Sequence, residues 1–233
     1  MERLMPKVLQ SPRATLRRSV RESYRARGKG NSNLWLVYSA KTNRDWLLPS
    51  DRQLIHWLHY LEAARDVVNF DLAPEPVLSV DDKEARKTEL DAIAVFRDGH
   101  SEWHEIKAES RPDSTDRSQF LSQAAAAATE GVKYCVFDDR DLRPVARLAL
   151  RWIKPLGFAA VLRGQEEIPC RNALAIYIND KKAGTVETLV SDLSLFDPPI
   201  LIGMLVRFAV RGGVDLDLQS RTFGWQTRWS CHG

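Results

Sequence analysis

Three charged residues stand in one short and otherwise apolar stretch of the chain. Asp91 precedes an apolar run, and Glu105 and Lys107 close the apolar run that follows the next turn. Side chains alternate along a strand, so Glu105 and Lys107 point to the same side. Charged residues are disfavoured inside strands, and their convergence therefore suggests a chemical role. Two carboxylates beside an amine could hold a divalent metal ion and position a water molecule, which is what hydrolysis of a phosphodiester bond requires.

The expected cofactor of such a site is Mg²⁺, with Mn²⁺ as a substitute. Mg²⁺ prefers oxygen ligands and keeps several waters, so one or two carboxylates suffice to hold it. We expect Asp91, Glu105 and the backbone carbonyl of Ile106 to be the metal ligands. Lys107 would orient or activate the attacking water, or stabilise the developing negative charge. The alternative is a surface hairpin on which the same residues form a cross-strand ion pair.

The elements that must position these residues can be predicted from the hydrophobic pattern. The carboxylates and the lysine fall on a predicted hairpin, with strands over 88–96 and 101–107 and a turn that contains Gly99. The flanking segments alternate between helical and extended patterns. They are a helix over 51–64 with Ser50 or Asp51 as N-cap, a strand over 66–70, a charged loop over 81–87, a helix over 114–130 and a buried strand over 132–137.

This order of motifs resembles the PD-(D/E)xK nuclease core. The features in common are Asp91 on one strand, Glu105-x-Lys107 on the next, and then a helix and a strand. The proline of that motif is absent, because Glu89 and Leu90 precede Asp91. The resemblance implies a restriction-endonuclease-like α/β fold, a mixed sheet flanked by helices.

A closer resemblance covers residues 36 to about 142. The segments 38–44 (Tyr-Ser-Ala-Lys-Thr-Asn-Arg) and 47–51 (Leu-Leu-Pro-Ser-Asp), a helix, and then 66–68 (Asp-Val-Val) look like TnsA, the endonuclease subunit of heteromeric transposases. Asp91 and the run 105–107 match the family's strand Asp and its Q/E-x-K strand. The resemblance implies a DNA endonuclease acting at transposon ends. Its implied partners are a DDE-type transposase with an Asp/Asp/Glu core and an ATPase regulator.

One position departs from the family pattern. The catalytic Glu that the family places near the start of the helix is replaced by Gln53. A Gln side chain offers a neutral oxygen that can bind metal or water, but it cannot act as a base. Glu62 lies about half a turn away in helical phase, so we do not expect it to replace Gln53. We place Gln53 with Asp91, Glu105 and Lys107 among the candidate catalytic residues. The alternatives are a non-catalytic DNA- or partner-binding module on a nuclease-like fold, and another restriction-like nuclease.

The C-terminal part follows a different pattern. After a connecting helix and linker over 143–170, residues 171–233 show helix, turn, helix and then a β-hairpin, an order typical of a winged helix. We therefore expect a winged-helix-like α+β domain after the nuclease domain of residues 31–142. The predicted recognition helix over 200–211 carries few basic residues, so a protein-binding role is at least as well supported as DNA reading.

Charge is distributed unevenly along the chain. Residues 1–30 contain nine Lys and Arg against two Glu, a net +7, whereas the whole chain carries only +3. Such a basic arm favours a polyanion partner such as DNA through counterion release. We predict a flexible arm over 1–30. The sequence has no run that resembles a transmembrane helix or a signal peptide, and three cysteines without ligand spacing suit a reducing cytoplasm.

Three histidines and two glutamines near these elements are weaker candidates for a role in the site. His56 and His59 are predicted on the polar side of their helix, in a solvated or DNA-facing role. His104 is expected to point away from Glu105 because the two are neighbours on one strand. Gln119 and Gln123, on the helix after Lys107, could face the cleft or form ordinary polar surface.

Overall fold

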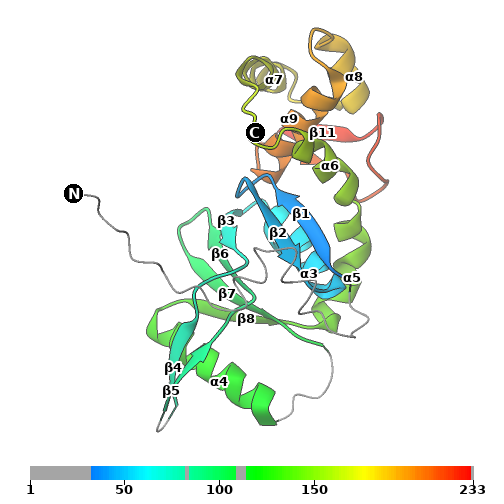
Figure 1. Cartoon of the computed structure of the whole chain (residues 1–233). Coiled ribbons are helices and arrows are strands. Elements are labelled where there is room, and N and C mark those ends of the chain that lie inside the picture. The colour runs from blue at the N-terminus through cyan, green and yellow to red at the C-terminus, as the bar shows by residue number, and fades with distance from the viewer. Residues whose placement is uncertain (1–32, 82–83, 109–113, 232–233) are drawn as a thin grey trace, which may run out of the picture.

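The computed structural model describes residues 33–81, 84–108 and 114–231, so the predicted arm over 1–30 lies outside the described residues. Within these ranges the chain is a mixed α/β protein with seven α-helices, a four-stranded mixed sheet and small antiparallel sheets (Figure 1). The mixed sheet and the flanking helices agree with the predicted α/β class.

The central sheet is built from three antiparallel strands and one parallel strand. Its order is β3 (Val67–Asp71), β6 (Ala92–Phe96), β7 (Ser101–Ile106) and β8 (Lys133–Phe137). β7 and β8 are parallel, whereas the other pairs are antiparallel. A parallel pair needs a long crossover, and α4 (Ser114–Thr129) provides it. Gly131, with a φ of 66°, ends the turn that leads from α4 into β8.

The two faces of this sheet carry alternate side chains of the same strands. Trp103 and Tyr134 lie on the face that packs against α4. His104 and Phe137 lie on the opposite face, where they contact His56 of α3 (Asp51–His56). Figure 1 shows α4 and α3 on opposite sides of the sheet. The alternation that separates Glu105 from His104 in the sequence is therefore kept in the structure.

The helix before the sheet has two parts. Ser50 is the N-cap, because its Oγ accepts a hydrogen bond from the Gln53 amide at 3.2 Å, as one of the two predicted caps requires. After α3 the chain continues as the π-helix η1 (Trp57–Glu62). Wider π turns change the phase of the side chains that follow, so the ideal helical phase used for Glu62 in the sequence does not apply strictly.

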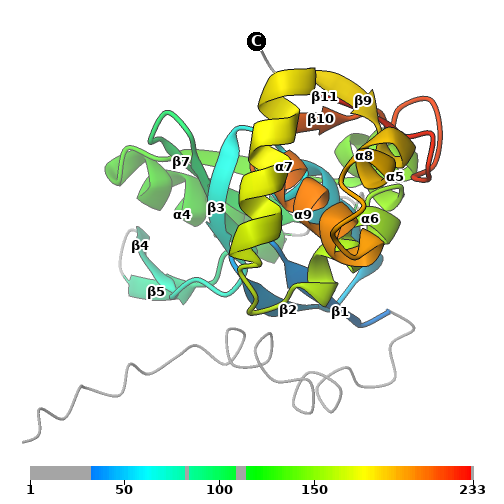
Figure 2. The same cartoon turned by 90° about the horizontal axis from the view of Figure 1, so that it is seen from above.

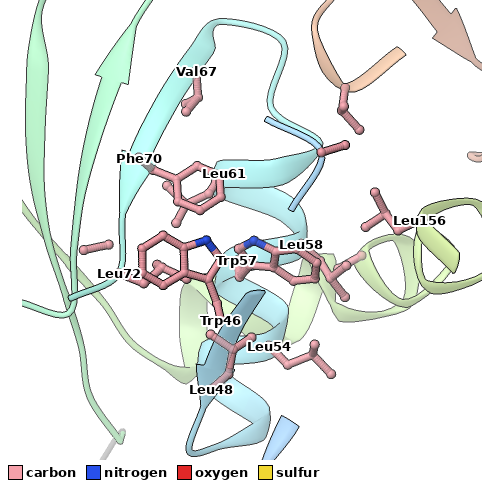
Figure 3. Close-up of a cluster of buried hydrophobic side chains, with 14 of the residues drawn as sticks. Trp46, Leu48, Leu54, Trp57, Leu58, Leu61, Val67, Phe70, Leu72 and Leu156 are labelled. Carbon is pink, nitrogen blue, oxygen red and sulfur yellow. The ribbon is translucent and has the colours of Figure 1, made fainter. Parts of the chain in front are cut away.

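The first hydrophobic cluster lies under the hairpin of β1 (Trp35–Ser39) and β2 (Arg44–Leu48). Figure 3 shows the indole of Trp46 beside Trp57, with leucines of the helix around them. Trp46, Leu58 and Leu61 are almost fully buried. Each buried leucine contributes about 1.5–3 kcal/mol to folding, which fixes the helix against the sheet.

Two local predictions are wrong. The charged segment predicted as a loop over 81–87 contains β5 (Glu84–Thr88), which pairs with β4 (Val77–Asp81) as a separate hairpin. As a result, residues 89–91 are irregular, and Asp91 precedes β6 instead of lying inside a strand that begins at 88. The charged sequence of β5 has no apolar alternation, so its pairing with β4 cannot be recognised from its hydrophobic pattern.

The C-terminal part contains helices and a three-stranded antiparallel sheet. The sheet order is β10 (Val214–Leu216), β11 (Arg228–Cys231) and β9 (Ala183–Thr185). The helices are α5 (Asp139–Leu150), α6 (Ile153–Val161), α7 (Ile168–Lys181), α8 (Val186–Asp192) and α9 (Pro198–Val210). The predicted helix, turn, helix and hairpin are present, and the short strand β9 was not predicted.

Helix α9 belongs to two hydrophobic clusters at once. Val206 and Val210 pack in the first cluster, under β1 and β2, whereas Leu201 and Leu205 pack in a second cluster with α7 and α8. α6 lies alongside α9 (Figure 2). The contact between the two helices is close, because a Cβ added to Gly203 of α9 would lie 2.5 Å from the carbonyl oxygen of Phe158 in α6.

Candidate functional site

Asp91 is the residue at which three elements meet. Its backbone amide donates to the His104 carbonyl of β7 at 3.0 Å. Its Oδ2 accepts from the Ile106 amide at 2.7 Å, and its Oδ1 accepts from Nε2 of Gln53 at 3.0 Å. The residue is only 2% exposed. A buried carboxylate with both oxygens hydrogen-bonded is held in one orientation, although each oxygen keeps a further lone pair for another partner.

Glu105 and Lys107 form the second half of the site. They extend to the same side of β7, and Nζ of Lys107 lies 3.2 Å from Oε1 of Glu105. Glu105 is fully buried, while the Lys107 side chain is 29% exposed. The ammonium group also lies 5.6 Å from the centre of the Phe120 ring on α4. The buried carboxylate and the aromatic ring together position the ammonium group of this partly exposed lysine.

The backbone of Ile106 is oriented toward Asp91. Its amide donates to the Asp91 carboxylate, and in an extended strand the carbonyl of the same residue points to the same edge. The carbonyl oxygen of Ile106 is therefore directed to the side of β7 on which Asp91 lies. This orientation is the one that the predicted third metal ligand needs.

Tyr134 of β8 lies near both carboxylates of the site. Its pKa is raised, first by burial and then by the negative charges of Glu105 and Asp91. Its hydroxyl donates to Oε1 of Gln123 at 2.5 Å. Neither Tyr134 nor Phe120 was predicted from the sequence, because neither belongs to a motif. Tyr134 reaches the site through the parallel pairing of β8 with β7, and Phe120 reaches it through the packing of α4 on the sheet; neither arrangement can be read from the sequence.

Gln123 serves the site as a support and does not line a cleft. It is fully buried, and its Nε2 donates to Oγ1 of Thr88 at 2.9 Å and to the Glu89 carbonyl at 3.3 Å. These bonds fix the irregular segment that leads to Asp91. The sequence left open whether Gln123 faces the cleft or forms ordinary polar surface. Its amide is instead buried and makes these contacts.

The donor set fits a hard divalent cation. Asp91 and Glu105 supply carboxylate oxygens, and Ile106 supplies a carbonyl oxygen. Oε1 of Gln53 is buried and has no hydrogen-bond partner within the described residues. Because Gln53 turns its NH₂ group to Asp91, this neutral oxygen is available to a metal ion or a water. Oxygen donors of this kind suit Mg²⁺ or Mn²⁺.

Glu62 is kept away from this site. It is fully buried and accepts hydrogen bonds from Oγ of Ser39 at 2.7 Å and from the Ala40 amide at 2.8 Å. Burial raises the pKa of Glu62, and it lowers the pKa of the neighbouring Lys41 to about 8. The pair holds the turn after β1 against the helix. The prediction that Glu62 does not replace Gln53 agrees with these contacts.

The histidine predictions are partly wrong. His56 is fully buried, not solvated, and its Nε2 lies 3.0 Å from Nδ1 of His104. His104 points away from Glu105, as predicted, and reaches Glu102 on the same face of β7. His59 is partly buried, and burial lowers its pKa. The helical wheel placed His56 on the polar side because it did not anticipate a second polar cluster beneath the helix.

Two arginines of α9 and its C-terminal end contact neighbouring backbone. Arg207, one of two basic residues expected there, is 8% exposed and donates to the Gln165 carbonyl at 2.6 Å and to the Leu162 carbonyl. Arg211 donates to the Ala40 carbonyl at 3.3 Å. Both guanidinium groups therefore tie α9 to neighbouring backbone. This arrangement gives Arg207 and Arg211 a part in the packing of α9.

Comparison of the chain with models of known protein families gives no match, and comparison with curated proteins gives no significant match either. Within the part of the chain that the structure describes, every helix is too short or too polar to cross a membrane.

Proposed function

We propose that the chain is a metal-dependent DNA endonuclease of the TnsA kind, which cuts at transposon ends with a DDE-type transposase and an ATPase regulator. The observation that carries the proposal is the meeting of Gln53, Asp91 and the Ile106 backbone beside the Glu105–Lys107 pair. Asp91, Glu105 and Lys107 are positions at which the sequence resembles the family, and Gln53 is the position at which it departs from it. The partners rest on that resemblance alone.

The arrangement of elements supports the finer fold assignment. The order α3, β3, β6, β7, α4, β8, with β8 parallel to β7, is the order expected of a restriction-endonuclease-like core. The order α7, β9, α8, α9, β10, β11, with β11 in the centre of its sheet, is that of a winged helix. We infer both assignments from topology.

Each residue of the site has a role in this mechanism. When bound, Mg²⁺ would neutralise charge on the scissile phosphate and lower the pKa of a coordinated water. Asp91, Glu105 and the Ile106 carbonyl would hold the ion. Gln53 keeps Asp91 in the ligating orientation through its hydrogen bond. Lys107, fixed by Glu105, would orient the attacking water or stabilise the charge that develops on the phosphate.

Supercoiled DNA that carries transposon ends provides the test. The full chain should nick it in Mg²⁺ or Mn²⁺ when the partner transposase is added, and Asp91→Asn or Lys107→Ala should abolish nicking. Lys181→Ala, which removes an exposed lysine of α7 that pairs with its neighbour Asp180, is the matched control and should keep full activity. Absence of metal-dependent cleavage with every partner combination would reject the enzyme assignment.

A second function is favoured by one contact. Gln53 occupies the position of the family's catalytic Glu and donates a hydrogen bond to Asp91 instead of offering a negative charge. A site that lacks this carboxylate could have become a DNA- or partner-binding module. In that case the chain would bind DNA or the transposase in the same assay with no cleavage.

A further inference from the structure

The face of the sheet opposite Asp91 and Glu105 carries a second polar cluster. Glu102 and His104 lie two residues apart on β7 and therefore share this face. Cys135 of β8 is the register partner of His104 in the parallel pair, so it lies beside it. The three ligand atoms all lie within 4.8 Å of one another. None of these residues takes part in the proposed nuclease chemistry.

We propose that Glu102, His104 and Cys135 bind a Zn²⁺ ion. This inference goes beyond the proposed endonuclease function and does not depend on it. An imidazole, a thiol and a carboxylate are a donor set typical of zinc and foreign to Mg²⁺, which prefers oxygen alone. The two faces of one sheet would then select different metals by the chemistry of their side chains.

Two of the three donor separations are those of a tetrahedral zinc site, and all three are within 4.8 Å. With metal–ligand bonds of about 2.0–2.3 Å, tetrahedral geometry places neighbouring donors roughly 3.3–3.6 Å apart. Nε2 of His104 lies 3.2 Å from Oε2 of Glu102, and Sγ of Cys135 lies 3.6 Å from the same oxygen. An ion could enter with small side-chain movements. The hydrogen bonds that now join these atoms would be replaced by bonds to the metal.

The surroundings of the cluster provide the support that a bound metal needs. Nδ1 of His104 lies 3.0 Å from Nε2 of His56, so His104 can donate a proton there and leave its own Nε2 as a lone pair toward the metal. A metal-binding imidazole must be neutral, and this hydrogen bond is compatible with a neutral His104. The ring of Phe137 packs 4.8 Å from His104 and limits its rotation.

The charges of the site would balance. Zn²⁺ with one carboxylate and one thiolate is neutral, so partial burial of the loaded site costs little. Zinc binds the thiolate form of cysteine, so binding would release the thiol proton of Cys135 to solvent. Lys133 holds the other oxygen of Glu102 at 2.6 Å. The Lys133 side chain is 67% exposed and can move away from an incoming cation.

The fourth coordination position would be open to exchangeable ligands. The three donors line a hollow of about 670 Å³, bordered also by His59, Tyr60 and Trp152. Zinc sites with three protein ligands keep the remaining position for water or another small ligand. The ion would join β7 to β8 directly, so zinc should raise the melting temperature of the chain.

Zinc titration of the metal-free full chain tests this proposal. With excess Mg²⁺ present to fill the oxygen site, the protein should bind one equivalent of Zn²⁺ in competition with a chromogenic chelator. Cys135→Ser and Glu102→Gln should weaken binding by about 100-fold or more, beyond the 10–100-fold typical of losing a supporting residue. Cys231→Ser removes another partly exposed thiol as the matched control and should leave the affinity unchanged.

Cobalt substitution provides a second readout that does not rely on a variant folding. Co²⁺ bound to the wild-type chain and to Cys231→Ser should show a thiolate-to-metal charge-transfer band, and any folded Cys135→Ser should lack it. The proposal is overturned if the wild-type chain binds no zinc in excess Mg²⁺ or shows no such band. It is equally overturned if Cys135→Ser binds zinc as the wild type does, or if Cys231→Ser is the variant that loses it.

Discussion

The Gln53 amide donates its hydrogen bond to Oδ1 of Asp91 at 3.0 Å, so the position where a carboxylate is expected holds a neutral group that supports one. Two negative side chains at this distance would repel each other without a metal. The substitution thus stabilises the metal-free site and removes one possible ligand charge. At position 53, a neutral side chain should favour the stability of the metal-free chain, and a carboxylate should favour metal affinity.

Restoring the carboxylate at position 53 should lower the stability of the metal-free chain and strengthen its response to Mg²⁺. Gln53→Glu is expected to lower the stability of the metal-free chain by about 1–3 kcal/mol, because a hydrogen bond to a buried charge becomes a repulsion. The same variant should gain a larger Mg²⁺-induced rise in melting temperature than the wild type. Gln219→Glu, on an exposed bend, is the control. Thermal melts in chelator and in Mg²⁺ that show no difference between Gln53→Glu and wild type would contradict the placement of Gln53 at a metal site.

Glu62 should be structural and not catalytic. Glu62→Ala would leave Lys41 buried without its opposite charge, and removal of one partner from such a pair costs about 3–5 kcal/mol. Glu130→Ala, at an exposed position just after α4, should have little effect. Denaturant unfolding measures both. The Mg²⁺-induced stabilisation should survive in Glu62→Ala, and its selective loss would place Glu62 in the metal site after all.

Lys41 should make stability depend on alkaline pH. Burial lowers its pKa from 10.5 to about 8 in the folded chain, so between these values the unfolded chain binds more protons. Its contribution to stability is therefore present above pH 10.5 and is lost as the pH falls through 8, with a size of about 3 kcal/mol. Lys41→Met should lack this contribution. Parallel unfolding curves across this pH range would show a steeper rise for wild type, and identical slopes would argue against a buried Lys41.

Two helical glycines offer a matched test of the contact between α6 and α9. A Cβ at Gly203 would lie 2.5 Å from the Phe158 carbonyl oxygen, so Gly203→Ala should destabilise the chain by about 1–3 kcal/mol. Gly157 is exposed in α6, and a Cβ there meets nothing within 4 Å. Gly157→Ala should instead stabilise the helix by about 0.5–1 kcal/mol. Equal melting temperatures for the two variants would disprove the close packing.

The basic arm should control the salt dependence of DNA binding. Replacing residues 1–30 by a Gly/Ser segment of equal length removes nine positive charges without shortening the chain. Binding should weaken, and the slope of log K against log salt should become shallower by about 0.9 for each phosphate that the arm no longer neutralises. Filter binding or anisotropy at several salt concentrations measures it. An unchanged slope would exclude binding of the arm to DNA phosphates.

The sequence predicts the local elements well where their cause is local. The Ser50 cap, the alternation of Glu105 and His104, and the proline-initiated α9 all follow from neighbouring residues. The placement of Gln53 near Asp91 was expected from the family pattern alone, and their hydrogen bond could not be derived from spacing.

What the sequence does not predict depends on pairing between distant segments. Cys135 has no ligand spacing to His104, because the two meet only through the parallel register of β7 and β8. Tyr134 approaches the carboxylates for the same reason, on the other face. The burial of Arg207 depends on carbonyls at the end of α6, and no helical wheel contains that information.

The sharing of α9 between the two hydrophobic clusters has a practical consequence for dissecting the protein. A fragment that ends near residue 142 would lose Leu156, Ala159, Val206 and Val210 from the first cluster and expose the apolar side chains they cover. Such a fragment should aggregate when expressed alone. The N-terminal half and the C-terminal half should melt in one cooperative transition, and gene fusions or truncations should keep the whole chain from β1 to β11.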